Sequence, residues 1–262
     1  MKSNLVILMA LAGCAGLTSR AEADLTLGTA GNFSVLAATT VTNTGPSLIN
    51  GGDIGVNPGT SITGFPPGTL AAPYVFHLGD AVAAKGEQDL QVAYNMATSL
   101  TPTQTLTGQD LGGLTLTPGV YFFSSSAALT GKLTLNDLGN ANAQFVFQIG
   151  TTLTTATNSS VVTVDNNGVL SPDSHVFWQV GSSATIGTST AFEGHILAYS
   201  SITFDTNATD LNGSALALNG AVTLDTNQIV NPSSVPEPGS LVLLVVGGGL
   251  TGLVTYRKRR QA

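Results

Sequence analysis

A triplet of one apolar residue, threonine and a second apolar residue recurs along the chain. "SITFDTN" begins at Ser201, and the matching phrase "AVTLDTN" begins twenty positions later at Ala221. The central threonines of the repeated pattern are Thr115, Thr134, Thr154, Thr185, Thr203 and Thr223. Their successive spacings of 19, 20, 31, 18 and 20 positions indicate one repeat with one insertion. We place the insertion between Asn158 and Ser174, where turn-forming residues are frequent.

Two longer repeats give the same register. "FVFQIGTTLT" from Phe145 matches "VFWQVGSSAT" from Val176 at an offset of 31 positions, and "GHILAY" from Gly194 matches "GSALAL" from Gly213. Repeats of about twenty residues, rich in β-branched side chains and with Gly or Asn corners, are typical of a β-solenoid. The sequence therefore predicts an all-β fold in which each turn holds about three short strands.

Alternation along each strand predicts which side chains face the core. Because successive side chains point to opposite faces of a strand, Ile202 and Phe204 point inward while Thr203 points outward. By the same rule Leu133, Val222 and Leu224 join the core. Stacked turns then place a column of threonines on one flat face, and its expected members are Thr134, Thr154, Thr185, Thr203 and Thr223.

One segment has helical rather than strand periodicity. Between residues 80 and 100, the small or apolar residues Val82, Gly86, Leu90, Ala93 and Ala97 lie three or four positions apart. Asp80 is suited to cap the start, and Pro102 ends the pattern. We expect one long helix here, with its small-residue stripe packed against a solenoid face.

Charge is unevenly distributed along the 262 residues. Between the two terminal segments, Lys85 and Lys132 are the only basic side chains against thirteen acidic ones, a formal charge of −11. An acidic body without arginine repels phosphate backbones and lacks their bidentate partner, which argues against nucleic-acid binding. Its simplest consequence is solubility.

The first segment resembles an export signal. Lys2, the apolar run from Leu5 to Leu17 and Ala21-Glu22-Ala23 predict a signal peptide over residues 1–23, with cleavage before Asp24. Leu11-Ala12-Gly13-Cys14 also fits a lipoprotein signal, in which Cys14 would be acylated. Cys14 is the only cysteine, so no disulfide within the chain is possible.

The last segment, residues 232–262, has three parts. Pro236-Glu237-Pro238 precedes an apolar run over 241–256, a candidate transmembrane segment, and Arg257-Lys258-Arg259-Arg260 follows it. This arrangement resembles the PEP-CTERM sorting signal of Gram-negative bacteria. The resemblance implies transient membrane anchoring, removal of the tail by an exosortase, and a place at the cell surface among exopolysaccharide. Residues 24–231 remain as one predicted solenoid domain.

Catalysis and metal binding have little support. Asp205 and Asp225 could form a carboxylate pair on adjacent turns, but stacked surface Asp is the simpler interpretation, and we expect no enzyme. His77, His175 and His195 show no metal-ligand spacing, so we expect no metal and no cofactor. Asp and Asn at the corners could hold calcium, although solvated turn residues explain them better.

The phrases of the body closely resemble the ice-binding protein-like family. They run from "LGTAGNFSVLAATTVTNTG" at Leu27, through "GDIGVNPGTSITGFPPGT" at Gly52 and "LGGLTLTPGVYFFSSSAALTG" at Leu111, to "NGAVTLDTNQI" at Asn219. The resemblance implies a discontinuous right-handed parallel β-solenoid of triangular section with the α-helix packed alongside. It also implies that the N-terminal strands fold back to join the C-terminal coils.

The same resemblance implies adsorption to ice through a flat, Thr-rich solenoid face. Some members of that family carry a T-A/G-x-T/N motif, which Thr155-Ala156-Thr157-Asn158 and Thr29-Ala30-Gly31-Asn32 both fit. Thr155 and Asn158 therefore join the candidate ice-binding residues. The alternative is a non-catalytic adhesin or matrix protein whose surface binds exopolysaccharide or another cell, and the tail favours it.

Overall fold

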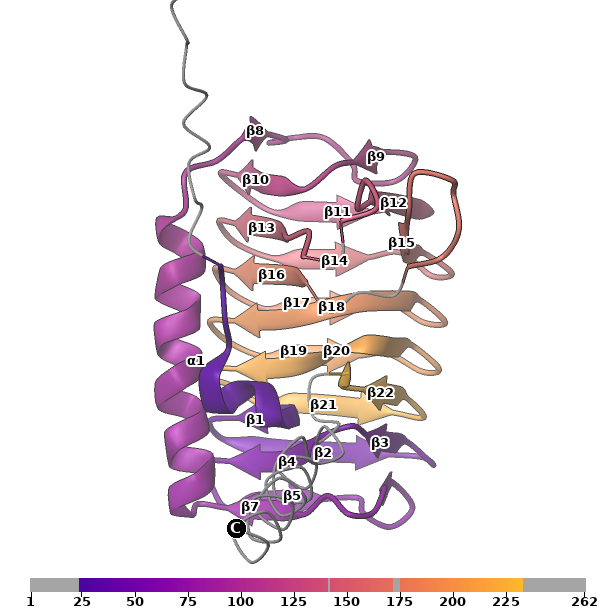
Figure 1. The fold of residues 1–262 in the computed structure, drawn as a ribbon. Helices are drawn as coiled ribbons and strands as arrows, with labels where there is room; N and C mark the ends of the chain where they lie inside the picture. The colour runs from indigo at the N-terminus through magenta and orange to yellow at the C-terminus, as the bar shows by residue number, and fades with distance from the viewer. Residues whose placement is uncertain (1–23, 141, 172–174, 233–262) are drawn as a thin grey trace, which may run out of the picture.

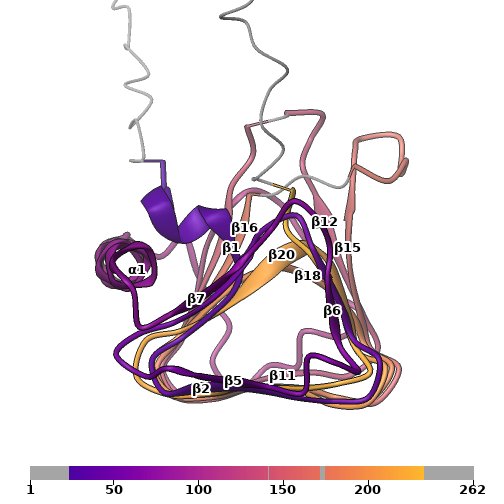
Figure 2. The ribbon, with the colours of Figure 1, turned by 90° about the horizontal axis from the view of Figure 1, so that it is seen from below.

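The protein is described here by a computed structural model covering residues 24–140, 142–171 and 175–232. These residues wind into stacked coils of triangular cross-section, with one long helix running along the stack (Figures 1 and 2). The expected fold class, a parallel β-solenoid with the helix alongside, is confirmed. The predicted signal peptide, the predicted PEP-CTERM motif and the predicted transmembrane run over 241–256 lie outside the described residues.

One side of the triangle, the helix face, is the side against which the helix packs. Its strands pair in parallel from one end of the stack to the other. In spatial order they are β8 (Gln104–Thr105), β10 (Gly119–Phe123), β13 (Phe145–Ile149), β16 (Val176–Val180), β18 (Ala191–Ala198), β20 (Thr209–Ala217), β1 (Phe33–Ala37), β4 (Asp53–Val56) and β7 (Phe76–Leu78).

The second side, the threonine face, is a separate sheet of seven strands. In spatial order they are β11 (Ala127–Leu129), β14 (Leu153–Thr155), β17 (Ala184–Ile186), β19 (Ile202–Phe204), β21 (Val222–Asp225), β2 (Thr40–Thr44) and β5 (Ser61–Thr63). The third face joins the first halves of β18 and β20 to β9 (Thr115–Leu116), β12 (Lys132–Asn136), β15 (Ser160–Val164), β22 (Gln228–Val230), β3 (Leu48–Asn50) and β6 (Thr69–Leu70).

The coils do not follow one another in chain order. The N-terminal strands form two turns that end at β7, and the helix α1 (Ala81–Ser99) then carries the chain to the opposite end of the stack (Figure 1). The remaining coils return to the first ones, because β1 pairs with β20, β2 with β21 and β3 with β22. Asn231 fixes this junction by donating to the carbonyl oxygens of Gly31 and Phe33. The discontinuous topology is therefore confirmed.

Alternation fills the interior as predicted. Leu133, Ile202, Phe204, Val222 and Leu224 are all at most 1% exposed. An aromatic stack runs through the coils from β10 to β18, with ring centroids 5.3, 3.9 and 5.0 Å apart in the order Tyr121, Phe147, Trp178 and Phe192. Phe145 pairs with Val176 and Gly194 pairs with Gly213, in the register that the repeats predicted.

The helix covers an apolar second layer on the helix face. Asp80 caps it by accepting from the backbone N–H groups of Val82 and Ala83 at 3.0 and 2.9 Å. Gly86 lets the helix approach closely, since a Cβ there would lie 2.7 Å from the ring of Phe33. The predicted stripe is wrong at one position: Ala83 is buried, whereas Val82 is 50% exposed.

The repeat was predicted with one insertion, but two coils are longer than the others. Ala128 on β11 pairs with Thr154, 26 positions away, and the 31-residue offset from Thr154 to Thr185 follows. Thr134 lies on the third face, where it pairs with Thr115 and Val162. The 20 positions between Thr134 and Thr154 therefore connect two different sides of the triangle. The predicted place of Thr134 in the threonine column is wrong.

The short helix η1 (Gly28–Asn32) holds the second match to the expected T-A/G-x-T/N motif. Thr29 donates to Asp89 on α1 at 2.6 Å, and Ala30 is fully buried. Because this segment packs against the helix, it contributes nothing to the threonine face.

Candidate functional site

One column of outward threonines runs the length of the threonine face. Each member points outward from a short strand, next to a side chain that points inward, and parallel pairing sets these residues in register. In spatial order the threonine column consists of Thr154, Thr185, Thr203, Thr223, Thr42 and Thr63, with Ala128 at the β11 end. Four of the predicted members, Thr154, Thr185, Thr203 and Thr223, thus lie together.

The spacing of the column follows from the sheet. Neighbouring strands lie about 4.8 Å apart, so six threonines span roughly 24 Å in nearly equal steps. Thr42 and Thr223 lie close enough for their hydroxyl oxygens to be 3.4 Å apart. β-Branching restricts χ1, so each hydroxyl and methyl is held in a nearly fixed orientation. The result is a stiff, repeating surface.

The neighbouring outward positions are also small. Two residues before the column, the strands carry Thr40, Ser61, Ser183, Ser201 and Ala221. The hydroxyl oxygens of Ser183 and Ser201 accept backbone N–H groups from the next coil, which fixes the edge of the sheet. In the part of the chain that the structure describes, none of the large exposed apolar side chains belongs to this sheet.

Among the described residues, Asp110 is bridged to Ala128 beyond the β11 end of the column, and Asp225 ends β21, two residues after Thr223. Asp225 is in register with Thr44, and its carboxylate accepts from the hydroxyls of Thr206 and Thr226 at 2.5 and 3.1 Å. These bonds give Asp225 a structural part in the corner. They agree with the interpretation of Asp205 and Asp225 as stacked surface residues.

Two other candidate residues have structural explanations. Thr155 points into the interior and is 3% exposed; its hydroxyl accepts from the Gly187 N–H at 2.8 Å and pairs with Thr190 at 3.0 Å. Its predicted place on an exposed face is therefore wrong, because alternation turns it inward beside Thr154. Asn158 is exposed but lies beyond the strand, at a corner with a φ of 60°.

The corner containing Asn158 recurs in successive coils. Ser189, Asn207 and Thr226 have φ angles of 55°, 60° and 56° at comparable places after their strands. Asn adopts this left-handed conformation more readily than most residues. The Asn at the end of the motif is thus explained by the turn of the backbone.

Thr42 and Thr63 were missed by the sequence pattern. In "VTN" and "ITG", Asn43 or Gly64 occupies the second apolar position, so neither segment is an apolar-Thr-apolar triplet. A comparison of "TVTNT" at Thr40 with "AVTLDT" would have revealed the first. Thr63 could not be found from the chain order, because β5 joins this sheet by pairing with β2, which in turn pairs with β21 of the C-terminal coils.

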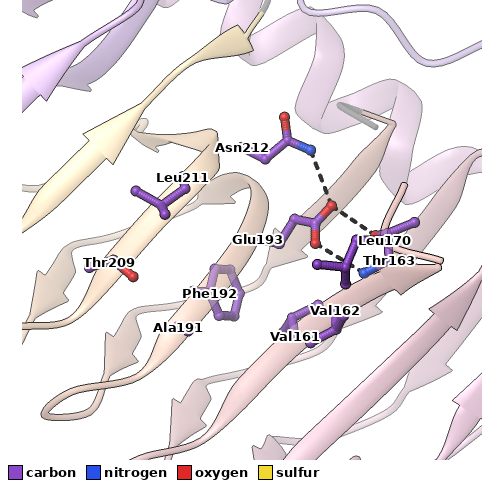
Figure 3. Close-up of a pocket in the computed structure, with 10 residues that line it drawn as sticks. All are labelled: Val161, Val162, Thr163, Leu170, Ala191, Phe192, Glu193, Thr209, Leu211 and Asn212. Atoms are coloured by element: carbon purple, nitrogen blue, oxygen red, sulfur yellow. Dashed lines mark hydrogen bonds between the residues drawn. The ribbon is translucent and has the colours of Figure 1, made fainter. Parts of the chain in front are cut away.

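A groove of about 250 Å³ on the third face contains a cluster of polar groups around Glu193 (Figure 3). Glu193 lies between Thr163 and Asn212 there, and accepts the Thr163 N–H at 3.1 Å, the Thr163 hydroxyl at 2.8 Å and the Asn212 amide at 3.1 Å. Since β15 and β18 pair only at Ser160 and Ala191 and then separate, Glu193 replaces the missing strand partner. This polar cluster therefore joins β15, β18 and β20 at the point where the strands separate.

Asp210 is a second buried carboxyl near this corner. Burial raises its pKa well above the ordinary range, and the nearby Glu193 adds to that, while the Asn212 N–H acts in the opposite direction. Within residues 24–140, 142–171 and 175–232, no group of three or more His, Cys, Asp or Glu is placed to hold a metal ion. The same ranges contain no helix long and apolar enough to cross a membrane.

The chain is similar to known proteins in sequence and in fold. The family model described as Ice-binding-like matches residues 35–230. An ice-binding protein of Nostoc sp. (strain HG1) is 54% identical over 242 residues, which cover 89% of this chain and 87% of that protein. The crystal structure of an ice-binding protein from an Antarctic biological consortium is 43% identical, has a TM-score of 0.73, and covers 87% of this chain and 96% of its own. The crystal structure of an ice-binding protein from the Antarctic ascomycete Antarctomyces psychrotrophicus is 41% identical and has a TM-score of 0.71. It covers 79% of this chain and 97% of its own.

Proposed function

This chain belongs to the ice-binding-like family, and on that premise we propose that it adsorbs to ice through the threonine column. The observation that carries the proposal is the run of six in-register threonines on an uncovered sheet. Its relatives from Nostoc and the Antarctic consortium are described as ice-binding proteins, so the same activity is the natural candidate here.

The chemistry of threonine suits a water lattice. Each hydroxyl can donate to and accept from water, while each methyl favours an ordered neighbouring layer. Because the side chains are already stiff, adsorption costs little conformational entropy. A column of equal steps multiplies individually weak contacts, in the manner of a multivalent ligand. No bond is made or broken in this process, so the function is non-enzymatic.

The proposal is tested by growing a single ice crystal in a solution of the purified protein. The parent is expected to shape the crystal and to produce thermal hysteresis, whereas Thr223→Tyr is expected to lose most of both. One protruding ring would hold the neighbouring hydroxyls and methyls away from the lattice. Circular dichroism should show that the variant remains folded, because Thr223 is exposed. A folded variant that shapes ice like the parent would refute this choice of face.

A second candidate role is that of a cell-surface adhesin or matrix protein, favoured by the sequence of the two ends. We propose that residues 1–23 direct export, by cleavage before Asp24 or by lipidation of Cys14. In the same proposal, an exosortase cuts the tail near Pro236-Glu237-Pro238 after transient anchoring through 241–256. Export and surface retention would then place the solenoid among exopolysaccharide, and this role is compatible with ice adsorption.

Mass spectrometry of the protein recovered from producing cells tests the ends. The expected products begin at Asp24 or at a lipidated Cys14, and lack the residues that follow the Pro-Glu-Pro motif. Intact chain in the cytoplasm would contradict export, and an exported chain with its complete tail would contradict cleavage. If the parent leaves ice unshaped, the adhesin role becomes the leading proposal.

A further inference from the structure

A groove of about 410 Å³ lies at the corner between the helix face and the threonine face. Tyr94 from the helix and Tyr199 from the loop after β18 line it, together with Phe122, Gln148 and Gln179 from the solenoid. Its volume is within the range of small-molecule sites, about 300–1,000 Å³. The groove is distinct from the threonine column, whose residues do not line it.

Two glycines keep the floor of the groove open. Gly150 and Gly181 follow the paired residues Ile149 and Val180 in adjacent coils. A Cβ on Gly181 would lie 2.3 Å from the Gly150 carbonyl oxygen, which leaves no space for a side chain. In the next coil the equivalent position holds Tyr199, because Val180 pairs with Ala198. The backbone of Gly150 and Gly181 therefore lines the groove beside an aromatic wall, which is formed by the rings of Tyr94 and Tyr199.

The aromatic wall is partly open to solvent. The rings of Tyr94 and Tyr199 lie 6.1 Å apart at 49°, and Tyr199 is 49% exposed. Phe122 lines the groove three strand spacings away along the helix face, roughly 14 Å. Exposed tyrosine carries an apolar ring and a polar hydroxyl, so it can pack against a ligand and donate a hydrogen bond to it.

The polar groups of the groove are neutral and held in place. Gln148 donates to the carbonyl oxygens of Ala97 and Leu100 at 2.7 and 2.9 Å, which satisfies the end of the helix and fixes the amide. Gln179 is its register partner on the next coil. No charged side chain lines the groove, so it offers nothing that selects phosphates, carboxylates or amines.

We propose that this groove binds a neutral oligosaccharide of hexopyranose units. The C–H face of a pyranose ring packs on the negative face of an aromatic ring, and its hydroxyls pair with amides and phenols. The length of the groove, from Phe122 to Tyr199, accommodates more than one ring. Only the biological setting of this inference rests on the proposed matrix role; the binding itself depends on neither ice adsorption nor cleavage of the tail.

The experiment titrates purified, ¹⁵N-labelled protein with cellohexaose, laminarihexaose and isomaltohexaose, and with oligogalacturonate as a charged control. At least one neutral probe is expected to shift the amide signals of Gly150 and Gly181 and the side-chain amide of Gln179. Tyr199→Ala should weaken that binding by about tenfold or more, as expected for an aromatic anchor. Tyr199→Phe, which keeps the ring, should bind within about threefold of the parent.

Leu211→Ala is the matched control, since Leu211 is an apolar side chain on the third face with a similar exposure of 53%. It should bind the probe like the parent. The proposal is overturned if no neutral probe shifts these signals at millimolar concentration, if the shifts map elsewhere, or if folded Tyr199→Ala binds unchanged. Crystal shaping by Tyr199→Ala should equal that of the parent, so a failure of sugar binding is distinguishable from a failure of ice adsorption.

Discussion

The helix face and the threonine face are built from the same coils, yet their outward side chains differ completely. On the helix face the outward column includes Leu197, Leu216 and Leu36, all fully buried beneath the helix. On the threonine face the outward column stays uncovered and is nearly uniform. A packed face selects shapes that fit a particular neighbour, whereas an uncovered face can repeat one residue without a packing cost.

The difference is visible in strand burial as well. All five residues of β1 are buried, as in a sheet covered on both sides, while in β21 buried residues alternate with exposed or partly exposed ones. The inward residues of both faces share one core. Stability therefore depends on the inward positions everywhere and on the outward positions only beneath the helix, and the following substitutions test that division.

The largest effect is expected in the core of the threonine face. Phe204→Ala should lower the free energy of unfolding by about 3–5 kcal/mol, because it leaves a cavity among fully buried neighbours. Thr203→Ala, one residue away and outward, should change it by about 0.5 kcal/mol or less. Urea unfolding measures both. Equal losses would contradict the assigned register and the division between the two sides of the strand.

A somewhat smaller effect is expected beneath the helix. Gly86→Val should cost about 1–3 kcal/mol, because the new side chain meets the ring of Phe33 where the helix approaches β1. Gln88→Val places the same β-branched residue on the exposed side of the helix and should cost only a few tenths of a kcal/mol. Thermal unfolding of the pair measures the difference. Similar melting temperatures would argue against close packing of the helix.

A dependence on pH is predicted at the same helix. Burial raises the pKa of Glu87 to about 8, and its Oε1 has no hydrogen-bond partner among the described residues. An unfolded Glu titrates near 4.3, so the folded state binds the proton more tightly. This contribution to stability is complete below about pH 4.3 and is lost as the pH rises through about 8.

Glu87→Gln should therefore gain stability relative to the parent as the pH rises from 5 to 9. Asp89→Asn is an informative control, because a hydrogen bond from Lys85 and then bonds from Thr29 lower the pKa of Asp89 to about 2. That variant should be less stable than the parent at both pH values, with little change between them. Melting temperatures at pH 5 and 9 decide the matter, and a constant difference for Glu87→Gln would disprove the buried state of this carboxyl.

The sequence was sufficient for the fold wherever local periodicity reports burial. The repeats at Phe145 and Val176, the inward residues around Phe204 and the limits of the helix all follow from alternation or helical spacing. Val82 was placed on the wrong side because a stripe of small residues does not distinguish two adjacent apolar positions. Tertiary contact with Phe33 and its neighbours decides that choice.

The candidate site was harder to predict because a triplet specifies a strand and not the side of the triangle that carries it. Thr134 and Thr203 occupy equivalent triplets, yet they lie on different faces, since the coil containing Thr134 includes a long corner. Thr42 enters the column only through pairing with Thr223, 181 positions later in the chain. Such long-range register depends on how the two sets of coils join, which spacing does not reveal.

The wrong prediction for Thr134 supplies the most direct test of the threonine column. Thr203→Tyr and Thr134→Tyr make the same change at outward threonines in equivalent strands, one on the threonine face and one on the third face. Both proteins, labelled with a fluorophore, are offered to a growing ice hemisphere, and the bound fluorescence is compared with that of the parent. We predict that Thr134→Tyr adsorbs like the parent while folded Thr203→Tyr is largely excluded. Adsorption of Thr203→Tyr at the level of the parent, or exclusion of Thr134→Tyr instead, would contradict the assignment of ice binding to the threonine column.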